Sequence, residues 1–258
     1  MKINIISNPK KNSKEFEDSL ISKLDNRYQK DNKNPDMCIS VGGDGTFLYM
    51  IHKYGFNPKI KYAGFNLGTV GFLTSFSSDE LDRFIDHLDK DFYVDKYAFL
   101  DIEIKNKSGV HKYKALNEIV LRNFINKSSR FEVFVNDEKL EDFVGDALMV
   151  STPVGSSAYN YNLGGPLIYD KVDSLILNAI APINNCSYKS INNAIWFDKD
   201  NVITVKPNKE YVIHFIIDGF DMTLKDVDYI KISLSNKKLD VLRFKKVSYS
   251  ELIHNKLL

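Results

Sequence analysis

Cysteine is scarce in this sequence of 258 residues, which contains only Cys38 and Cys186. Two cysteines cannot form the disulfide framework of a small secreted domain, and their scarcity fits a reducing compartment. A run of about 18 apolar residues is also lacking, and the apolar stretch at the N-terminus is too short for a signal peptide. We therefore expect a soluble cytoplasmic protein.

An excess of positive charge is absent as well, because 35 Lys and Arg balance 34 Asp and Glu. This balance argues against a nucleic-acid binder that relies on bulk charge. The five histidines are scattered without the spacing of metal ligands, so no metal site is predicted. Basic residues do gather at Arg243, Lys245, Lys246 and Lys256, either as a local patch or as one face of a solvated terminal helix.

Residues 1 to about 95 alternate between strand and helix patterns. Such alternation is typical of an α/β domain with a parallel sheet and helices on its faces. A Ser77 or Ser78 cap with Glu80 near the third position opens one of the helices. Strands are predicted at 2–7, 37–41 and 61–66, and helices at 13–30, 46–54 and 78–88.

From about residue 96 to 240 the apolar pattern changes to period two, with few helix candidates. This part is therefore expected to be mainly β. The run 131–135 ends at the turn Asn136–Asp137, and a closing helix is predicted at 248–258. Further strands are predicted at 100–105, 202–205, 211–217, 229–234 and 239–244.

Charge is missing altogether from residues 147–169, although 27% of the whole chain is charged. The stretch is rich instead in Ser, Thr, Asn, Tyr and Gly. Neutral hydrogen-bonding groups on a glycine-rich backbone suit a preformed small-molecule site. The alternative is a buried, turn-rich corner of the β part.

Three glycines surround a single aspartate in Gly42–Thr46, between a predicted strand and a predicted helix. Glycine lets backbone N–H groups approach a ligand, and the start of a helix favours phosphate. Neither the P-loop nor the Rossmann fingerprint fits, since no Gly-Lys pair occurs and Leu48 replaces the last glycine. A carboxylate here repels phosphate, so Asp44 needs a role such as binding a metal or taking a proton from an attacking hydroxyl. A plain tight turn is the alternative.

A second glycine-rich segment, residues 64–73, follows the next predicted strand. Loops at the carboxyl ends of neighbouring parallel strands share one crevice, so the two glycine-rich loops are expected to line one site. In the β part, Asn117 and Glu118 interrupt an apolar run. A glutamate there is costly unless it is paired or exposed, so Glu118 either binds sugar hydroxyls or occupies an exposed strand position.

These segments together resemble the bacterial NAD kinases. Gly42–Thr46 matches the signature that this family shares with diacylglycerol and sphingosine kinases and, more loosely, with phosphofructokinases. Leu116–Glu118 and the run from Gly145 to Pro166, with Ser-Thr-Pro-Val-Gly-Ser-Ser-Ala-Tyr at 151–159, look like two further family motifs in the expected order. Ile183–Asn185 is similar to the next one. The match covers about residues 36–220.

The resemblance implies that ATP or polyphosphate, with Mg²⁺ or another divalent cation, phosphorylates the adenosine ribose 2′-hydroxyl of NAD to give NADP. Asp44 would be the general base. The phosphate donor would contact Gly42, Gly43 and Thr46. The residues implied in binding NAD are Gly45, Phe72, Asn117, Glu118, Asp146, Ser157, Ala158, Tyr159 and Asn162.

The resemblance also implies a C-terminal β-sandwich, a terminal helix that returns to the first domain, and a homodimer or homotetramer. The expected domains are 1–95, with about 241–258 packing back, and 96–240. Asp146 and the segment around Ile183 are similar to residues that reach the neighbouring subunit's ligand. The chain departs from the family in having Ala147 for a glycine, Val144 for a basic residue, and Phe220 where a polar residue is common.

Two other functions remain open from the sequence. A lipid kinase of the same superfamily would need an apolar or basic membrane-facing surface, whereas the neutral stretch 147–169 suits a polar dinucleotide better. A non-catalytic NAD(P)-binding regulator would keep the pocket without the chemistry, and the intact Gly42–Thr46 motif argues against it.

Overall fold

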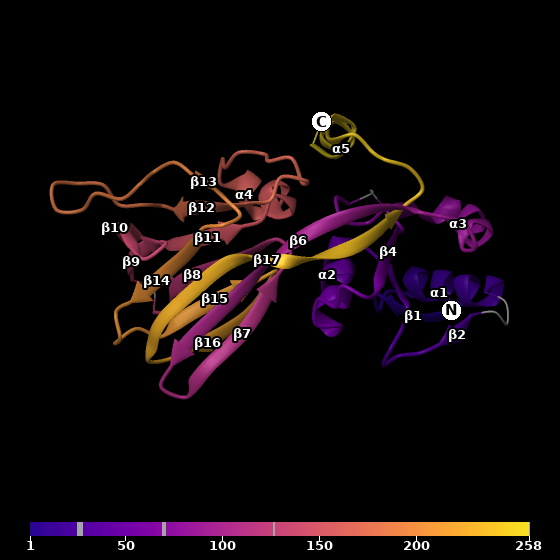
Figure 1. The fold of residues 1–258 in the computed structure, drawn as a ribbon, viewed down its shortest axis with the longest axis horizontal. Helices are drawn as coiled ribbons and strands as arrows, with labels where there is room; N and C mark the ends of the chain where they lie inside the picture. The colour runs from indigo at the N-terminus through magenta and orange to yellow at the C-terminus, as the bar shows by residue number, and fades with distance from the viewer. Residues whose placement is uncertain (25–27, 69–70, 126, 258) are drawn as a thin grey trace. The chain divides into compact units, whose positions relative to one another are not determined.

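The computed structural model describes residues 1–24, 28–68, 71–125 and 127–257, and Figure 1 shows its helices and strands. The chain forms two compact units. Unit 1 contains Met1–Tyr97 and Lys238–Leu258, and unit 2 contains Ala98–Lys237. Two long strands, β6 (Tyr93–Asn106) and β17 (Val227–Arg243), contribute residues to both units. Within the described ranges, the helices are too short or too polar to cross a membrane.

Unit 1 is built on parallel strands, as the alternating pattern predicts. Strand β3 (Met37–Val41) lies between β1 (Lys2–Ser7) and β4 (Lys61–Asn66), all paired in parallel. All five residues of β3 are buried, which explains why it reads as a continuous apolar run. The C-terminal end of β17 pairs with β4, while the two-residue strands β2 (Gln29–Lys30) and β5 (Phe76–Ser77) pair with β1 and β4.

The helices of unit 1 differ from the sequence prediction mainly at their ends. Helix α1 covers Lys11–Lys23, so the predicted helix 13–30 extends too far, because residues 29–30 pair with β1 as strand β2. A capping box between Ser77 and Glu80 opens a 3₁₀ turn, Ser78–Glu80, which runs into α3 (Leu81–His87). Helices α2 (Asp44–Lys53) and α5 (Tyr249–Leu257) complete the unit.

Unit 2 is a β-sandwich. One sheet contains β10, β9, β14 and β17, with the β6–β7 hairpin also paired to β17; the other has the order β13-β12-β11-β8-β15-β16. The core of unit 2, including Phe131, Phe143, Leu148 and Phe215, lies between the two sheets. The bounds are β7 Gly109–Ala115, β8 Glu118–Asn123, β9 Ser129–Val135, β10 Glu138–Gly145, β11 Ala147–Ser151, β12 Ser174–Ile180, β13 Ile195–Asp198, β14 Val202–Pro207, β15 Ile213–Ile217 and β16 Phe220–Leu224.

The expected fold class, an α/β domain followed by an all-β sandwich, is confirmed. Asn136 and Asp137 form the predicted turn with φ of 50° and 68°, the left-handed region that tight hairpins require. The two strands predicted at 229–234 and 239–244 form the single strand β17, since the linking residues contain no glycine or proline that would turn the chain. The terminal helix α5 belongs to unit 1, as expected.

Candidate active site

The glycine-rich loop Gly42–Gly43 joins the carboxyl end of β3 to the first residue of α2, which is Asp44. Gly42 has a φ of 149°, and a Cβ atom there would overlap the Thr46 side chain and lie 3.2 Å from the Cβ atom of Asn8. Only glycine fits this position without strain. The close approach also brings the end of β1 against the loop, where the Asn8 N–H donates to the Val41 carbonyl at 2.9 Å.

The Asp44 carboxylate lies inside a cradle of backbone N–H groups from the second glycine-rich segment. Phe72 donates to Oδ2 at 2.8 Å, and Leu73 and Thr74 donate to Oδ1 at 3.1 and 3.2 Å. The Thr74 hydroxyl adds a longer contact to Oδ1 at 3.4 Å. The two glycine-rich loops therefore do meet in one place, and Asp44 joins them. Residues 69–70 of the second segment lie outside the described residues.

The two oxygens of Asp44 are not equivalent. Oδ1 accepts three of these contacts and Oδ2 accepts one. A carboxylate oxygen has about two lone-pair positions, so among the described residues Oδ2 keeps one for a further donor. Gly42–Thr46 thus forms a tight turn whose aspartate is bound by a second, distant loop.

A hollow of about 660 Å³ opens beside the same loop in unit 1. Residues of the glycine-rich loop and of the first turn of α2 line this hollow, and the N-terminal end of a helix favours an anion. Of this lining, the sequence motif Gly42–Thr46 was predicted to belong to the site, whereas Ser7–Lys10 and Tyr49 were not. Residues 8–10 follow the carboxyl end of β1. Ligands of parallel α/β sheets bind at the carboxyl ends of the strands, so this position could have identified the segment. The lining residues are Ser7, Asn8, Pro9, Lys10, Gly43, Gly45, Thr46 and Tyr49.

In unit 2, Asn117 and Glu118 are held by a buried carboxylate far away in the sequence. Asp218 accepts the N–H groups of Leu116 and Asn117 at 2.7 Å each and that of Glu118 at 3.2 Å. The Thr152 N–H donates to the Asn117 carbonyl at 2.8 Å. The motifs around residues 117, 152 and 218 therefore converge on one short turn, which fixes its backbone.

Glu118 is not an exposed strand residue. Its Oε2 atom is buried and, in the part of the chain that the structure describes, accepts no hydrogen bond. Burial and, to a smaller extent, the charge of Asp218 raise the pKa of the Glu118 carboxyl to about 8, although a hydrogen bond from the Tyr159 backbone lowers it. At neutral pH the group is therefore largely a neutral acid that can donate as well as accept hydrogen bonds.

The neutral stretch after β11 contains a 3₁₀ turn, Val154–Ser157, and the single-turn helix α4 (Tyr159–Asn162). Ser157 and Ala158 are half-buried, whereas Tyr159 and Asn162 are exposed. Asn160 is buried, and its amide donates to the carbonyls of Ser156 at 3.1 Å and Pro166 at 3.0 Å. Part of the stretch is thus a buried turn, as the alternative interpretation proposed. The sequence did not reveal that the Asn160 amide links the two sides of this turn.

Asp146 lies apart from these groups within one chain. It is exposed and directly precedes β11. The register of β11 on β8 pairs Ser151 with Glu118 and Ala147 with Arg122, so Asp146 and Glu118 lie at opposite ends of β11. Five strand residues span roughly 17 Å, which is too far for both side chains to contact one small group.

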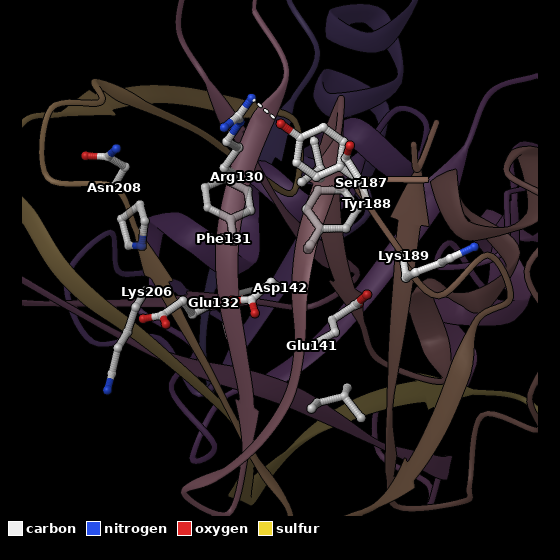
Figure 2. A pocket seen from close by; sticks show the side chains of 14 residues that line it. Arg130, Phe131, Glu132, Glu141, Asp142, Ser187, Tyr188, Lys189, Lys206 and Asn208 are labelled. Carbon is white, nitrogen blue, oxygen red and sulfur yellow. Dashed lines mark hydrogen bonds between the residues drawn. The ribbon is translucent and has the colours of Figure 1, made fainter. Parts of the chain in front are cut away.

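A larger hollow of about 740 Å³ lies over β9, β10 and the neighbouring loops of unit 2 (Figure 2). Arg130 donates to the Tyr188 hydroxyl there at 2.9 Å, and Val144 lies buried in its wall. None of the predicted site residues lines it. Its charged lining residues are of both signs: Arg130, Lys189 and Lys206 with Glu132, Glu141 and Asp142. This mixture does not single out a ligand.

Two family models match most of the chain. The model described as the ATP-NAD kinase N-terminal domain matches residues 3–93, and the ATP-NAD kinase C-terminal domain matches residues 116–244. A relative named NAD kinase from Streptococcus gordonii is 34% identical over 92% of this chain and 88% of its own length. Another NAD kinase, from Finegoldia magna, is 32% identical over 99% of this chain and 97% of its own length.

Solved structures share the fold. The crystal structure of yeast NADH kinase complexed with NADH has a TM-score of 0.86 at 18% identity and covers 100% of this chain and 87% of that chain. The structure of an NAD kinase from Archaeoglobus fulgidus in complex with ATP has a TM-score of 0.74 at 23% identity, with 95% of each chain covered. At these identities the similarity shows the fold alone.

Proposed function

The chain belongs to the ATP-NAD kinase family and is an enzyme of that family, and we propose that it transfers the γ-phosphoryl group of ATP, or a phosphoryl group of polyphosphate, to the adenosine ribose 2′-hydroxyl of NAD. The product is NADP. The observation that carries this proposal is the Asp44 carboxylate, held by three backbone N–H groups next to the glycine-rich loop that lines a hollow of about 660 Å³.

Asp44 is proposed as the general base, with Oδ2 accepting the proton of the 2′-hydroxyl. The three N–H donors hold the side chain in one orientation, so the hydroxyl meets a preorganised acceptor. A carboxylate is a weak base at neutral pH, but in a loose transition state the proton leaves late. Positioning then contributes more to the rate than basicity.

The hollow beside Gly43, Gly45 and Thr46 is proposed as the site of the donor phosphates. The backbone of the loop and the start of α2 would face them. Gly42 would keep the loop close enough for these contacts. Mg²⁺ would enter with ATP as part of the substrate, since this ion commonly binds phosphate oxygens with few protein ligands.

Unit 2 is proposed to bind NAD. The fixed Asn117–Glu118 turn would hold adenosine groups by hydrogen bonds, and Ser157, Ala158 and Tyr159 would surround the adenine, with Asn162 close by. Phe72 is also proposed to bind NAD. Because Asp146 and Glu118 lie at opposite ends of β11, Asp146 would serve the ligand of a neighbouring subunit in a homodimer or homotetramer.

The deciding experiment measures NADP formation from NAD with ATP and Mg²⁺, in the wild type and in Asp44→Asn. We expect NADP from the wild type and a loss of most turnover in the variant, while calorimetry shows that the variant still binds NAD. Binding of NAD without turnover by the folded wild type would favour a regulator. If NAD does not bind at all, a lipid kinase of the same superfamily becomes the better hypothesis.

A further inference from the structure

Helix α5, at the end of the chain, brings Lys256 to the loop that holds Asp44. The Lys256 ammonium donates a hydrogen bond to the Gly71 carbonyl at 2.6 Å. The next N–H along the chain, that of Phe72, donates to Asp44 Oδ2 at 2.8 Å. All of these residues belong to unit 1.

These two hydrogen bonds use the two ends of the same peptide group. The Gly71 carbonyl and the Phe72 N–H form one planar unit, and in a trans peptide they point in opposite directions. An ammonium on the carbonyl therefore fixes the direction in which the N–H points. Hydrogen bonds in such a chain also polarise one another, so the cation makes the N–H a better donor. The N–H reaches Oδ2, the oxygen that keeps a lone pair for an incoming hydroxyl.

The loop needs a restraint from outside because Gly71 directly precedes the N–H group that binds Asp44 Oδ2. Gly71 has no side chain that could anchor it, and a Cβ atom there would overlap the Asp44 carboxylate. Glycine also has more backbone conformations available than any other residue. Rotation of the Gly71–Phe72 peptide would withdraw the Phe72 N–H from Oδ2, and the Lys256 contact opposes that rotation.

Asp44 and Arg243 are the charged groups that act on the Lys256 ammonium. Lys256 is half-buried, and its pKa is lowered to about 8, mainly by burial. Asp44 of α2 raises that pKa, and Arg243 at the end of β17 lowers it. Arg243 is itself buried, with hydrogen bonds to Asp95 and to the Tyr97 hydroxyl. Lys256 and Asp44 thus attract each other across one peptide group.

We propose that Lys256 is a positioning residue for the phosphoryl transfer: through the Gly71 carbonyl it holds the Phe72 N–H on Asp44 Oδ2 and so orients the carboxylate towards the acceptor hydroxyl. This inference rests on the proposed function for its effect on turnover. The contact itself lies within unit 1 and can be tested without turnover. As pH rises through about 8, Lys256 loses its proton and the restraint weakens.

The test compares Lys256→Met and Lys256→Arg with the wild type. The control is Lys246→Met, since Lys246 is an exposed lysine of the same C-terminal segment. In Lys256→Met we expect kcat to fall roughly tenfold while KM for NAD changes less than about twofold, because positioning and not binding is lost. Lys256→Arg restores most of kcat. We expect the wild-type kcat to fall above about pH 8, and we expect this fall to be absent in Lys256→Met and to move to higher pH in Lys256→Arg.

Amide hydrogen exchange of residues 72–74 measures how firmly their N–H groups are held on Asp44, independently of turnover. We expect faster exchange in Lys256→Met, with wild-type protection in Lys256→Arg and Lys246→Met at an unchanged unfolding temperature. Wild-type kcat and wild-type protection in Lys256→Met would overturn the inference, and so would an arginine variant no better than the methionine one. If the wild type forms no NADP, the proposed function fails, and the exchange measurement still decides whether Lys256 restrains the loop.

Discussion

Gly71 lies so close to Asp44 that the loop has no room for a side chain at position 71. A Cβ atom built there would overlap the Asp44 carboxylate. The same loop supplies the N–H groups of Phe72 and Thr74 that hold this carboxylate. The glycine is therefore needed for close approach, and its replacement must move either the loop or the aspartate.

Gly71→Ala is expected to lower kcat by roughly a hundredfold, because a shift of about 1 Å at the reacting groups has an effect of that size. The matched control is Gly68→Ala, since the nearest atom to a Cβ at position 68 is Asn66 Oδ1, at an ordinary 3.8 Å. Steady-state kinetics with NAD and ATP measure both variants. Equal losses of activity in the two would contradict the role of Gly71.

Glu118 predicts an unusual dependence of stability on pH. The pKa of its carboxyl rises from an ordinary value of 4.5 to about 8 on folding, so between these values the folded state binds more protons than the unfolded state. The free energy of unfolding should therefore fall as pH rises through this window. Glu118→Gln cannot ionise, so its free energy of unfolding should not fall in this way. The difference in free energy of unfolding between the variant and the wild type should be about 1–3 kcal/mol larger at pH 8 than at pH 6.

Urea unfolding at several pH values measures this difference. The control is Glu138→Gln, because Glu138 is exposed. A constant difference between Glu118→Gln and the wild type from pH 6 to pH 8 would show that Glu118 is ionised throughout.

Lys10 is expected to act on the phosphate donor and not on NAD. It lies in the wall of the hollow beside Gly43 and Thr46. Lys10→Ala should raise KM for ATP several-fold, leave KM for NAD unchanged, and make KM for ATP less dependent on salt. Lys11→Ala is the control, since Lys11 is exposed and pairs with Glu15 at 3.7 Å. An equal rise of both KM values in Lys10→Ala would place the donor elsewhere.

Asp146 is expected to complete the site of a neighbouring subunit, because it lies at the other end of β11 from Glu118. Asp44→Asn and Asp146→Ala should each have low activity alone. Mixed oligomers of the two should recover part of it, since one site then combines an intact Asp44 with the neighbour's intact Asp146. Co-expression with two affinity tags isolates the mixed species. Activity no higher than the average of the two parent variants would assign Asp146 to its own chain's site or to none.

Local signals in the sequence predicted much of the architecture. The strands 2–7, 37–41 and 61–66 have the predicted bounds, because buried parallel strands are short apolar runs. The capping box at Ser77 and the turn at Asn136 were also readable, since both depend on residues only a few positions apart. Prediction failed at residues 29–30 and across β17, because pairing with other strands decides the structure there and not local preference.

The sequence by itself determined the two kinds of domain and the glycine-rich loop around Asp44. Only the tertiary structure decided what surrounds these groups. Lys256 reaches Gly71 across 185 positions, and Asp218 reaches Asn117 across 101. Contacts of this kind have no periodic or local signature, because they arise from how packed elements place side chains that are distant in the chain.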